Sequence, residues 1–211
     1  GSLSDDVDFP SELRDGWQGF SDLSVRDLNS KNILQKYIKK PIHLVLDPTF
    51  LYDFSGMESK CPEKDFILIY TTGFGLELQS RAKAYASKKG KRLISIGYVD
   101  NFSDHNAIGI GPFEFLGYFK SASEVITNTL HGTIFAVKYN KPLAIICDSY
   151  RKNKLATIIS KFDLECQMVP EDGAGLEECL ERNMDYHKIN KTIHSEVLSS
   201  RAYLAGALSE I

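Results

Sequence analysis

Residues 124–146 of the chain, EVITNTLHGTIFAVKYNKPLAII, contain two short apolar segments on either side of a longer helix-like one. The outer segments have the length and composition of buried strands, and the middle one has the length of a helix. This order predicts a βαβ unit with two parallel strands. His131 falls where the first strand ends and the helix begins, and a histidine at that turn requires an explanation.

The same alternation of strands and helices extends in both directions from this unit. Such alternation predicts an α/β fold, a Rossmann-like doubly wound domain with a mainly parallel sheet covered on both faces. Asn29 or Ser30 is the predicted cap of the first helix, Gly90 the predicted end of the second, and Pro112 suits the first turn of the third. The expected strands are residues 20–27, 41–48, 65–72, 92–98, 124–128, 142–147 and 166–169. The expected helices are residues 28–38, 76–90, 112–122, 131–140 and 151–163, with two more helical segments towards the C-terminus.

The two ends of the chain differ in character. Residues 1–18 have little periodic hydrophobicity, begin with a Gly-Ser typical of a cloning remnant, and are expected to form a linker or arm. Residues 19–211 are expected to form the Rossmann-like domain. The chain is therefore expected to be a piece of a longer protein.

Composition excludes several classes of function. The 211 residues are 43% hydrophobic and 25% charged, with a net charge of -3, so nothing in the charge balance favours binding to nucleic acid. The four cysteines form no CxxC pair, which predicts reduced thiols in a cytoplasmic protein and no zinc site. No apolar run approaches the ~20 residues of a membrane span.

Ligands of open α/β sheets bind beyond the carboxyl ends of the strands. His131 lies at such a turn, where the N–H groups of Leu130 to Thr133 would point outward from a helix N-terminus and favour an anion. Gly132 lets a ligand approach the backbone, and the Thr133 hydroxyl adds a donor. The alternative is a histidine that caps its own helix.

Arg26 lies at the end of another expected strand. Its guanidinium can hold a carboxylate or a phosphate with two parallel hydrogen bonds. The alternative is an ion pair with Asp27 or Asp47. Arg151 stands with Lys152 and Lys154 at a helix start, where cations oppose the helix dipole, so these residues either bind an anion or form a solvated face.

Four blocks of the sequence resemble the C-terminal half of the polysaccharide pyruvyl transferase family. They are SVRD (24–27), LVLDPTFL (44–51), GPFEFLGYFKSASEVITNTLHGTIFAVKYNKPL (111–143) and SYRKNKLATIISKFDLE (149–165), and their order and spacing agree over most of residues 20–165. The resemblance implies a GT-B-like enzyme with its active site between two Rossmann-like domains. It also implies transfer of an enolpyruvyl unit from phosphoenolpyruvate to a sugar of a surface polysaccharide or its precursor, which leaves a ketal and releases phosphate.

The resemblance implies roles for particular residues. Arg26 matches the arginine that contacts phosphoenolpyruvate, His131 the histidine at the centre of the site, and Leu130 a backbone contact. Thr129 stands where some members carry a basic residue, and Arg151 is the candidate substitute. The expected catalytic residues are His131 and Arg26. The expected donor-binding residues are Arg26, Asn128, Thr129, Leu130, His131, Gly132, Thr133 and Arg151.

No metal and no cofactor other than phosphoenolpyruvate as donor substrate is expected. The expected partners are a sugar or lipid-linked oligosaccharide acceptor and an N-terminal domain of the full-length chain. Two alternatives stay open at this point. One is half of a nucleotide-sugar glycosyltransferase, with Asp148 or Glu165 as the carboxylate for the ribose. The other is a non-catalytic donor-binding or interaction module.

Overall fold

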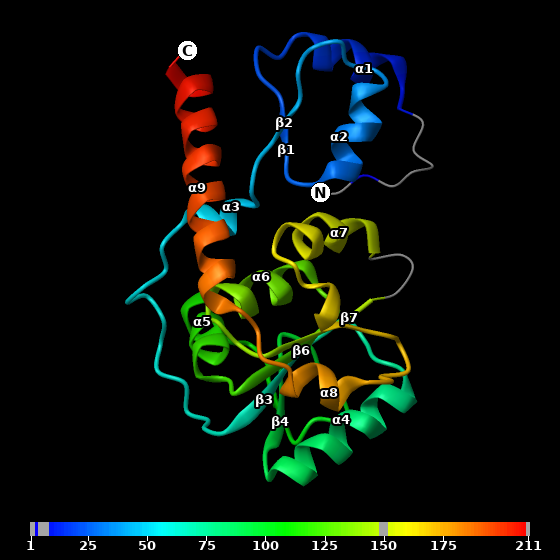
Figure 1. Cartoon of the computed structure of the whole chain (residues 1–211), viewed down its shortest axis with the longest axis vertical. Coiled ribbons are helices and arrows are strands. Elements are labelled where there is room, and N and C mark those ends of the chain that lie inside the picture. The colour runs from blue at the N-terminus through cyan, green and yellow to red at the C-terminus, as the bar shows by residue number, and fades with distance from the viewer. Residues whose placement is uncertain (1–2, 4–8, 148–151, 210–211) are drawn as a thin grey trace.

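A computed structural model describes residues 3, 9–147 and 152–209 of the chain. Its main feature is a sheet of six parallel strands in the order β5-β4-β3-β6-β7-β8 (Figure 1). The prediction of a mainly parallel sheet is therefore confirmed. The strands are β3 (Phe66–Tyr70), β4 (Arg92–Ile96), β5 (His105–Ala107), β6 (Glu124–Thr127), β7 (Leu143–Ile146) and β8 (Met168–Val169).

The sheet is doubly wound, and its strand order reverses between β3 and β6. From β3 the chain crosses through α4 (Leu76–Lys89) to β4, and α5 (Pro112–Ser121) then returns it from β5 to β6. From β6 it crosses through α6 (Leu130–Lys138) to β7. A crevice is expected at such a reversal, outside the carboxyl ends of the two strands.

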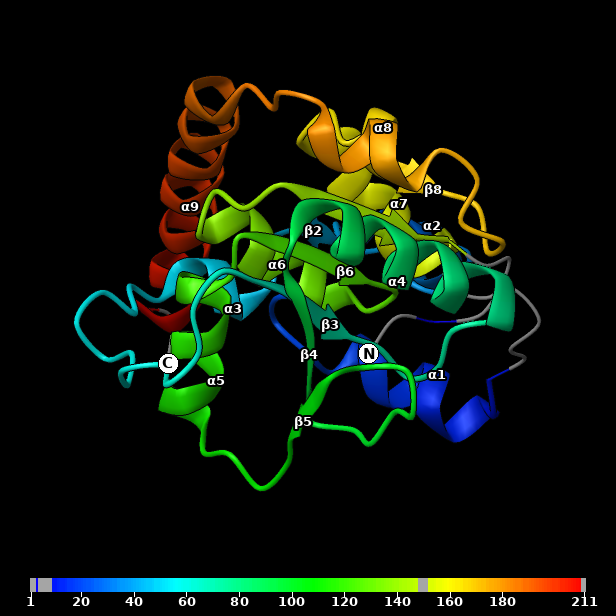
Figure 2. The same ribbon diagram turned by 90° about the horizontal axis from the view of Figure 1, so that it is seen from below.

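The core of the main sheet has two layers, because successive side chains of a strand point to opposite faces. Phe66 and Leu68 of β3 pack towards α5, α6 and α7 (Lys152–Lys161), whereas Ile67 and Ile69 pack towards α4 and α8 (Leu176–Glu181). Figure 2, seen from below, shows α4 and α8 on one side of the sheet and α5 on the other. This burial on both faces explains why β3 is apolar at every position.

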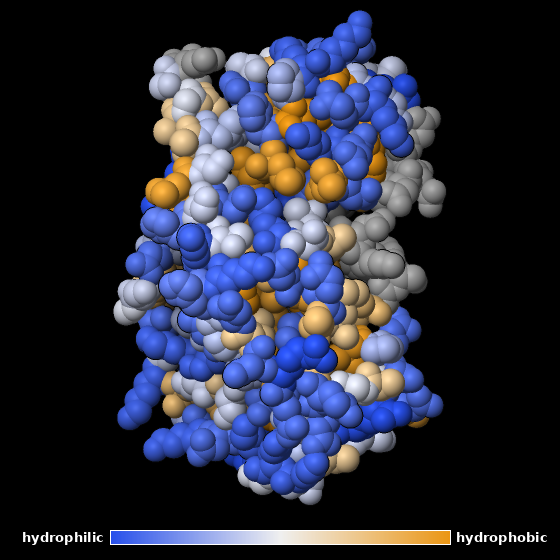
Figure 3. Space-filling model, in the orientation of Figure 1, coloured by the Kyte–Doolittle hydropathy of each residue, from blue (hydrophilic) through white to orange (hydrophobic). Residues whose placement is uncertain are grey.

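Two further strands form a separate small sheet. They are β1 (Ser24–Val25) and β2 (His43–Leu44), which are parallel and joined by α2 (Leu28–Gln35). The long helix α9 (Tyr186–Ser209) contacts both sheets: Ile189 packs into the main core, and Ser200 accepts a hydrogen bond from the backbone of Leu46 at 2.9 Å. Figure 1 shows α9 running along the side of both units, and Figure 3 shows apolar side chains gathered over β1, β2 and α2. The strands expected at 20–27 and 41–48 are thus shorter than expected and do not join the main sheet.

Several local expectations agree with the structure. Gly90 ends α4 in the left-handed region with φ 64°, and Pro112 occupies the first turn of α5. The cap of α2 is different from the expected Asn29 or Ser30, because the carboxylate of Asp27 accepts a hydrogen bond from the Ser30 N–H at 2.7 Å. An Asp is an equally good cap, and its position two residues before Asn29 lets the helix begin at Leu28.

Three elements lie in segments that were expected to be irregular. Helix α1 (Ser11–Gln18) lies within the expected arm, β5 lies within the expected loop 98–111, and the short helix α3 (Pro48–Leu51) lies in a segment expected to be strand end and loop. Aromatic contacts stabilise α1, since the ring of Phe9 packs edge-on against Trp17 and Tyr37. Strand β5 is short and polar at two of its three positions, so its own sequence does not indicate a strand. It forms because it pairs with β4. Along the described residues, none of the helices has both the length and the apolarity required to cross a membrane.

Candidate active site

A buried carboxylate, that of Asp47, organises the polar cluster at the junction of the two sheets. Asp47 caps α3, and its Oδ1 accepts hydrogen bonds from the backbone N–H of Thr49 at 3.0 Å and from the Thr49 hydroxyl at 2.6 Å. The Asp47 side chain is only 4% exposed. A buried carboxylate needs such donors and a nearby cation.

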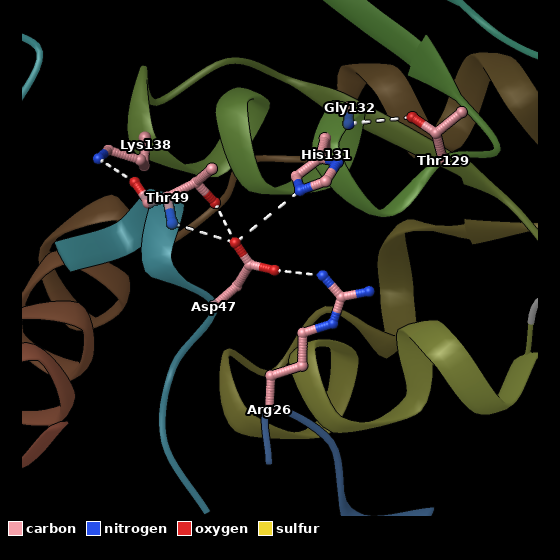
Figure 4. A network of polar contacts seen from close by, with 7 residues as sticks. All are labelled: Arg26, Asp47, Thr49, Thr129, His131, Gly132 and Lys138. Carbon is pink, nitrogen blue, oxygen red and sulfur yellow. Dashed lines mark hydrogen bonds and ion pairs between the residues drawn. The ribbon is translucent and has the colours of Figure 1, made fainter. Parts of the chain in front are cut away.

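Arg26 and His131 approach this carboxylate from different elements (Figure 4). Arg26 follows β1, and its Nη1 donates to Asp47 Oδ2 at 2.5 Å. His131 lies in the first turn of α6, and its Nε2 is 3.8 Å from Asp47 Oδ1. The structure therefore brings together the two residues that the sequence singled out, although they belong to different sheets.

The guanidinium of Arg26 has hydrogen-bond donors that are unpaired among the described residues. Its Nε is buried, and no hydrogen-bond partner lies within reach of it among the described residues. Since Nη1 is taken by Asp47, the N–H of Nε and one N–H of Nη2 remain as a fork of the kind that binds a carboxylate or phosphate with two parallel bonds. A buried donor without a partner costs free energy unless a ligand satisfies it. The ion pair considered as an alternative for Arg26 thus exists, with Asp47, while the Nε–Nη2 edge of the guanidinium stays unpaired among the described residues.

The first turn of α6 offers two backbone donors. The hydroxyl of Thr129 caps the helix by accepting from the Gly132 N–H at 3.0 Å, and the Thr133 N–H bonds to the carbonyl of Thr129. The N–H groups of Leu130 and His131 have no partner within the described part of the chain. These two amides at a helix N-terminus favour an anion.

Thr129 and Thr133 have no hydroxyl proton left for a ligand. The Thr133 hydroxyl donates to the Thr129 carbonyl at 3.1 Å. The Thr127 hydroxyl donates to the carbonyl of Tyr70 at 2.6 Å, so the proton in its 3.0 Å contact with Thr129 comes from Thr129. The two threonines of the expected donor-binding set therefore hold the turn in place.

Asn128 also supports the backbone of the site. Its side chain is buried, accepts a hydrogen bond from the Thr72 N–H at 3.2 Å and donates one to the carbonyl of Gly73 at 3.0 Å. These bonds tie the turn after β3 to the turn after β6, where the strand order reverses. Within the described residues Asn128 thus orders the loop, and its role as a direct ligand stays a prediction.

Gly132 is required by close packing. A Cβ at this position would lie 2.1 Å from the Thr127 hydroxyl oxygen and 2.8 Å from that of Thr129. Gly132→Ala should therefore displace the capped turn and lower the free energy of unfolding by about 1–3 kcal/mol. Urea denaturation followed by circular dichroism measures this change. Gly206→Ala in α9 is the matched control, since nothing lies within 4 Å of its Cβ position. Equal stability of the two variants would contradict the prediction.

Two cavities adjoin these residues. One of about 300 Å³ lies at the strand-order reversal and includes Asn128 in its lining. Another of about 400 Å³ lies between the small sheet and α9, and Arg26 and Asp27 contribute to its wall. The rest of that wall is Ser24, Val25, Val45, Leu46, Pro48, Leu51 and Leu204. Arg26 thus lies beside an open space with a largely apolar wall.

The match to known families decides how this cluster is interpreted. The family model described as polysaccharide pyruvyl transferase matches residues 12–146, which include Arg26, Asp47 and the whole 128–133 turn. The chain belongs to this family. No curated protein matches the chain.

Membership in the polysaccharide pyruvyl transferase family implies a transferase that modifies a polysaccharide. The matched segment ends at residue 146, so the block at 149–165 lies beyond it. Arg151, the expected substitute cation, lies outside the described residues.

Burial and hydrogen bonds set the electrostatics of the site. Burial raises the pKa of the Asp47 carboxyl, but the hydrogen bonds from Thr49 and Arg26 outweigh it, so that this pKa lies below its usual value. Asp47 is therefore a carboxylate at neutral pH. Burial lowers the pKa of Lys138 to about 8. Its Nζ donates to the carbonyls of Thr49 and Tyr52 at 2.6 and 2.7 Å.

Sequence reasoning left Asp47 and its supports out of the site. Asp47 was considered as a position at a strand end, as a partner for Arg26 and as a turn former before Pro48, whereas Thr49 and Lys138 were not singled out. The available signal was an Asp at the end of an expected strand, in the same kind of position as Arg26. The expected helix 131–140 already contained both His131 and Lys138, but only the folded chain shows that Lys138 donates to the carbonyl of Thr49 and so supports the turn that presents Asp47.

Proposed function

We propose that this pyruvyl transferase moves the enolpyruvyl unit of phosphoenolpyruvate to a sugar of a polysaccharide or of its precursor. The product is a ketal of pyruvate across two hydroxyls, and inorganic phosphate is released. The protein acts as the C-terminal half of a GT-B-like pair of domains, with an N-terminal domain and a sugar or lipid-linked oligosaccharide as partners. Cys61, Cys147, Cys166 and Cys179, all among the described residues, form no disulfide, which suits a cytoplasmic reaction.

The observation that carries the proposal is the unpaired edge of Arg26, whose guanidinium shares the Asp47 carboxylate with His131. Phosphoenolpyruvate has a carboxylate and a phosphate, so its site requires several donors. The Nε–Nη2 fork of Arg26 would hold one anionic group. The N–H groups of Leu130 and His131, which have no partner among the described residues, would hold the other. Family membership gives the transferred group, and the donor set fits a donor with two anionic groups.

The reaction balances without a redox partner. One acceptor hydroxyl adds to the carbon that bears the phosphate, and the methylene carbon gains a proton to become the methyl group. A second hydroxyl then displaces the phosphate, which leaves with the remaining proton. His131 either transfers a proton during addition or stabilises the departing phosphate. Oxidation states do not change, so the chemistry requires no organic cofactor besides the donor.

Thermal unfolding with different donors tests the proposal. A ligand that binds only the folded chain stabilises it by about 2.7 kcal/mol at 100 times its Kd. We expect phosphoenolpyruvate to raise the melting temperature and UDP-sugars to leave it unchanged. A shift with UDP-sugars alone would instead support a glycosyltransferase. No shift with either ligand would overturn the proposal that this chain binds a donor. The remaining interpretation would then be a non-catalytic interaction module.

A further inference from the structure

We propose that Asp47 is a positioning residue of the donor site: its carboxylate sets the orientation of Arg26 and faces the imidazole of His131. The inference rests on the proposed function, because the anion that Arg26 receives is taken to be part of the donor. It adds a residue that neither the family match nor the sequence motifs assign to the site.

Burial keeps Asp47 from being a ligand of the substrate. Its side chain is 4% exposed, and its two oxygens already face Thr49 and Arg26. Its negative charge would by itself repel an incoming anion. A carboxylate in this place therefore weakens anion binding unless its effect on the orientation of Arg26 and on the charge of His131 outweighs the repulsion.

Asp47 determines which edge of the Arg26 guanidinium stays unpaired. The contact from Nη1 to Oδ2 fixes the plane of the guanidinium, so the Nε–Nη2 edge faces away from the carboxylate. That edge includes the buried Nε that has no partner among the described residues. Without Asp47 the Arg26 side chain would sample many rotamers. The anion would then bind more weakly, because its binding would have to order that side chain at a cost in conformational entropy.

The contact with His131 is electrostatic. A distance of 3.8 Å between Nε2 and Oδ1 is too long for a hydrogen bond, and the pair is an ion pair only when the imidazole carries a proton. The carboxylate therefore stabilises the charge that the imidazole gains if it accepts a proton from the acceptor hydroxyl. This is the relation between an orienting carboxylate and a catalytic histidine in other enzymes.

The position of Asp47 relative to His131 is fixed by one helix. Lys138 at the end of α6 donates to the carbonyl of Thr49, and Thr49 in turn donates to Asp47. Lys138 also contacts the ring of Phe54, with 4.6 Å between its Nζ and the ring centroid. Helix α6 therefore carries His131 in its first turn and, through Lys138, also supports the Thr49 turn that holds the Asp47 carboxylate (Figure 4).

The test compares the affinity of the chain for inorganic phosphate, measured by calorimetry at constant salt, before and after Asp47→Asn. Removing a negative charge beside an anion site should tighten binding if Asp47 contributes only charge. A positioning role predicts the opposite, a loss on the order of 10-fold, the usual scale for groups that orient a ligand. The matched control is Asp53→Asn, an exposed carboxylate that accepts from Ser55 after α3.

A second variant covers the case in which Asp47→Asn does not fold. Thr49→Val removes the hydroxyl bond to Asp47 Oδ1 and keeps the charges of Asp47 and Arg26. We expect a smaller loss of phosphate affinity with unchanged secondary structure. Unchanged or tighter phosphate binding in the folded variants, or no phosphate binding by the wild-type chain, would overturn the role of Asp47. If the phosphate results hold while phosphoenolpyruvate gives no thermal shift, the proposed donor fails and the role of Asp47 stands.

Discussion

His131→Ala should reduce pyruvyl transfer on the order of 100-fold or more. This is the usual scale for a group that moves a proton or stabilises developing charge in the transition state. The imidazole is suited to either task, because its side chain is 47% exposed and its Nε2 faces the Asp47 carboxylate. The measurement is acceptor-dependent release of inorganic phosphate from phosphoenolpyruvate by the full-length enzyme, with a panel of oligosaccharide acceptors.

The control for this variant is His194→Ala, which removes an exposed histidine of α9. Thermal melting of both variants should stay close to that of the unmodified protein, since neither change opens a buried cavity. Full activity of the His131→Ala enzyme would reject a catalytic role for this residue. A loss confined to KM, with kcat retained, would assign it to donor binding alone.

Arg26→Lys should have an effect of similar size, with a different signature. Lysine keeps the positive charge beside Asp47 but lacks the planar fork, so it can satisfy the carboxylate and still fail to hold the donor with two bonds. We expect turnover to fall on the order of 100-fold or more and the affinity for phosphoenolpyruvate to fall with it. Calorimetry with phosphoenolpyruvate and the phosphate-release assay measure the two quantities separately.

Arg92→Lys provides the matched control, because Arg92 pairs with Glu63 at the opposite, N-terminal end of β4. It should leave both donor affinity and turnover unchanged. If Arg26→Lys retained the wild-type affinity for phosphoenolpyruvate, the positive charge alone would account for donor binding. The unpaired Nε–Nη2 edge of Arg26 would then have no role in it. If Arg92→Lys lowered the affinity for phosphoenolpyruvate as much as Arg26→Lys, the effect would not be specific to the candidate site, and the role of Arg26 would be rejected.

The main sheet could be predicted from the sequence because its central strands are apolar on both faces. Glycine and proline also marked helix ends correctly at Gly90 and Pro112, where the backbone itself demands those residues. Strand β5 and helix α1 could not be predicted in the same way. Their stability comes from pairing with β4 and from the ring of Phe9, contacts that no local pattern encodes.

The candidate site could be predicted only in part. Position at strand ends pointed to Arg26 and His131, and the structure brings both to one carboxylate. The Thr133 hydroxyl was expected to donate to a ligand, whereas in the structure it donates to the Thr129 carbonyl, and the Thr129 hydroxyl contacts that of Thr127. A direct role of either threonine in donor binding stays a prediction. Whether a hydroxyl is available depends on its neighbours in three dimensions, and the importance of Asp47 depends on contacts between the two sheets.

The arrangement of Arg26 and His131 on separate sheets has a consequence for how the molecule holds together. Arg26 follows the small sheet, whereas His131 begins a helix of the large one, and α9 runs along both. An anion that bridges Arg26 and the first turn of α6, as proposed, would connect the two sheets, so that its binding and their alignment would be coupled. The enzyme would then be most rigid when it is loaded and ready to receive the sugar.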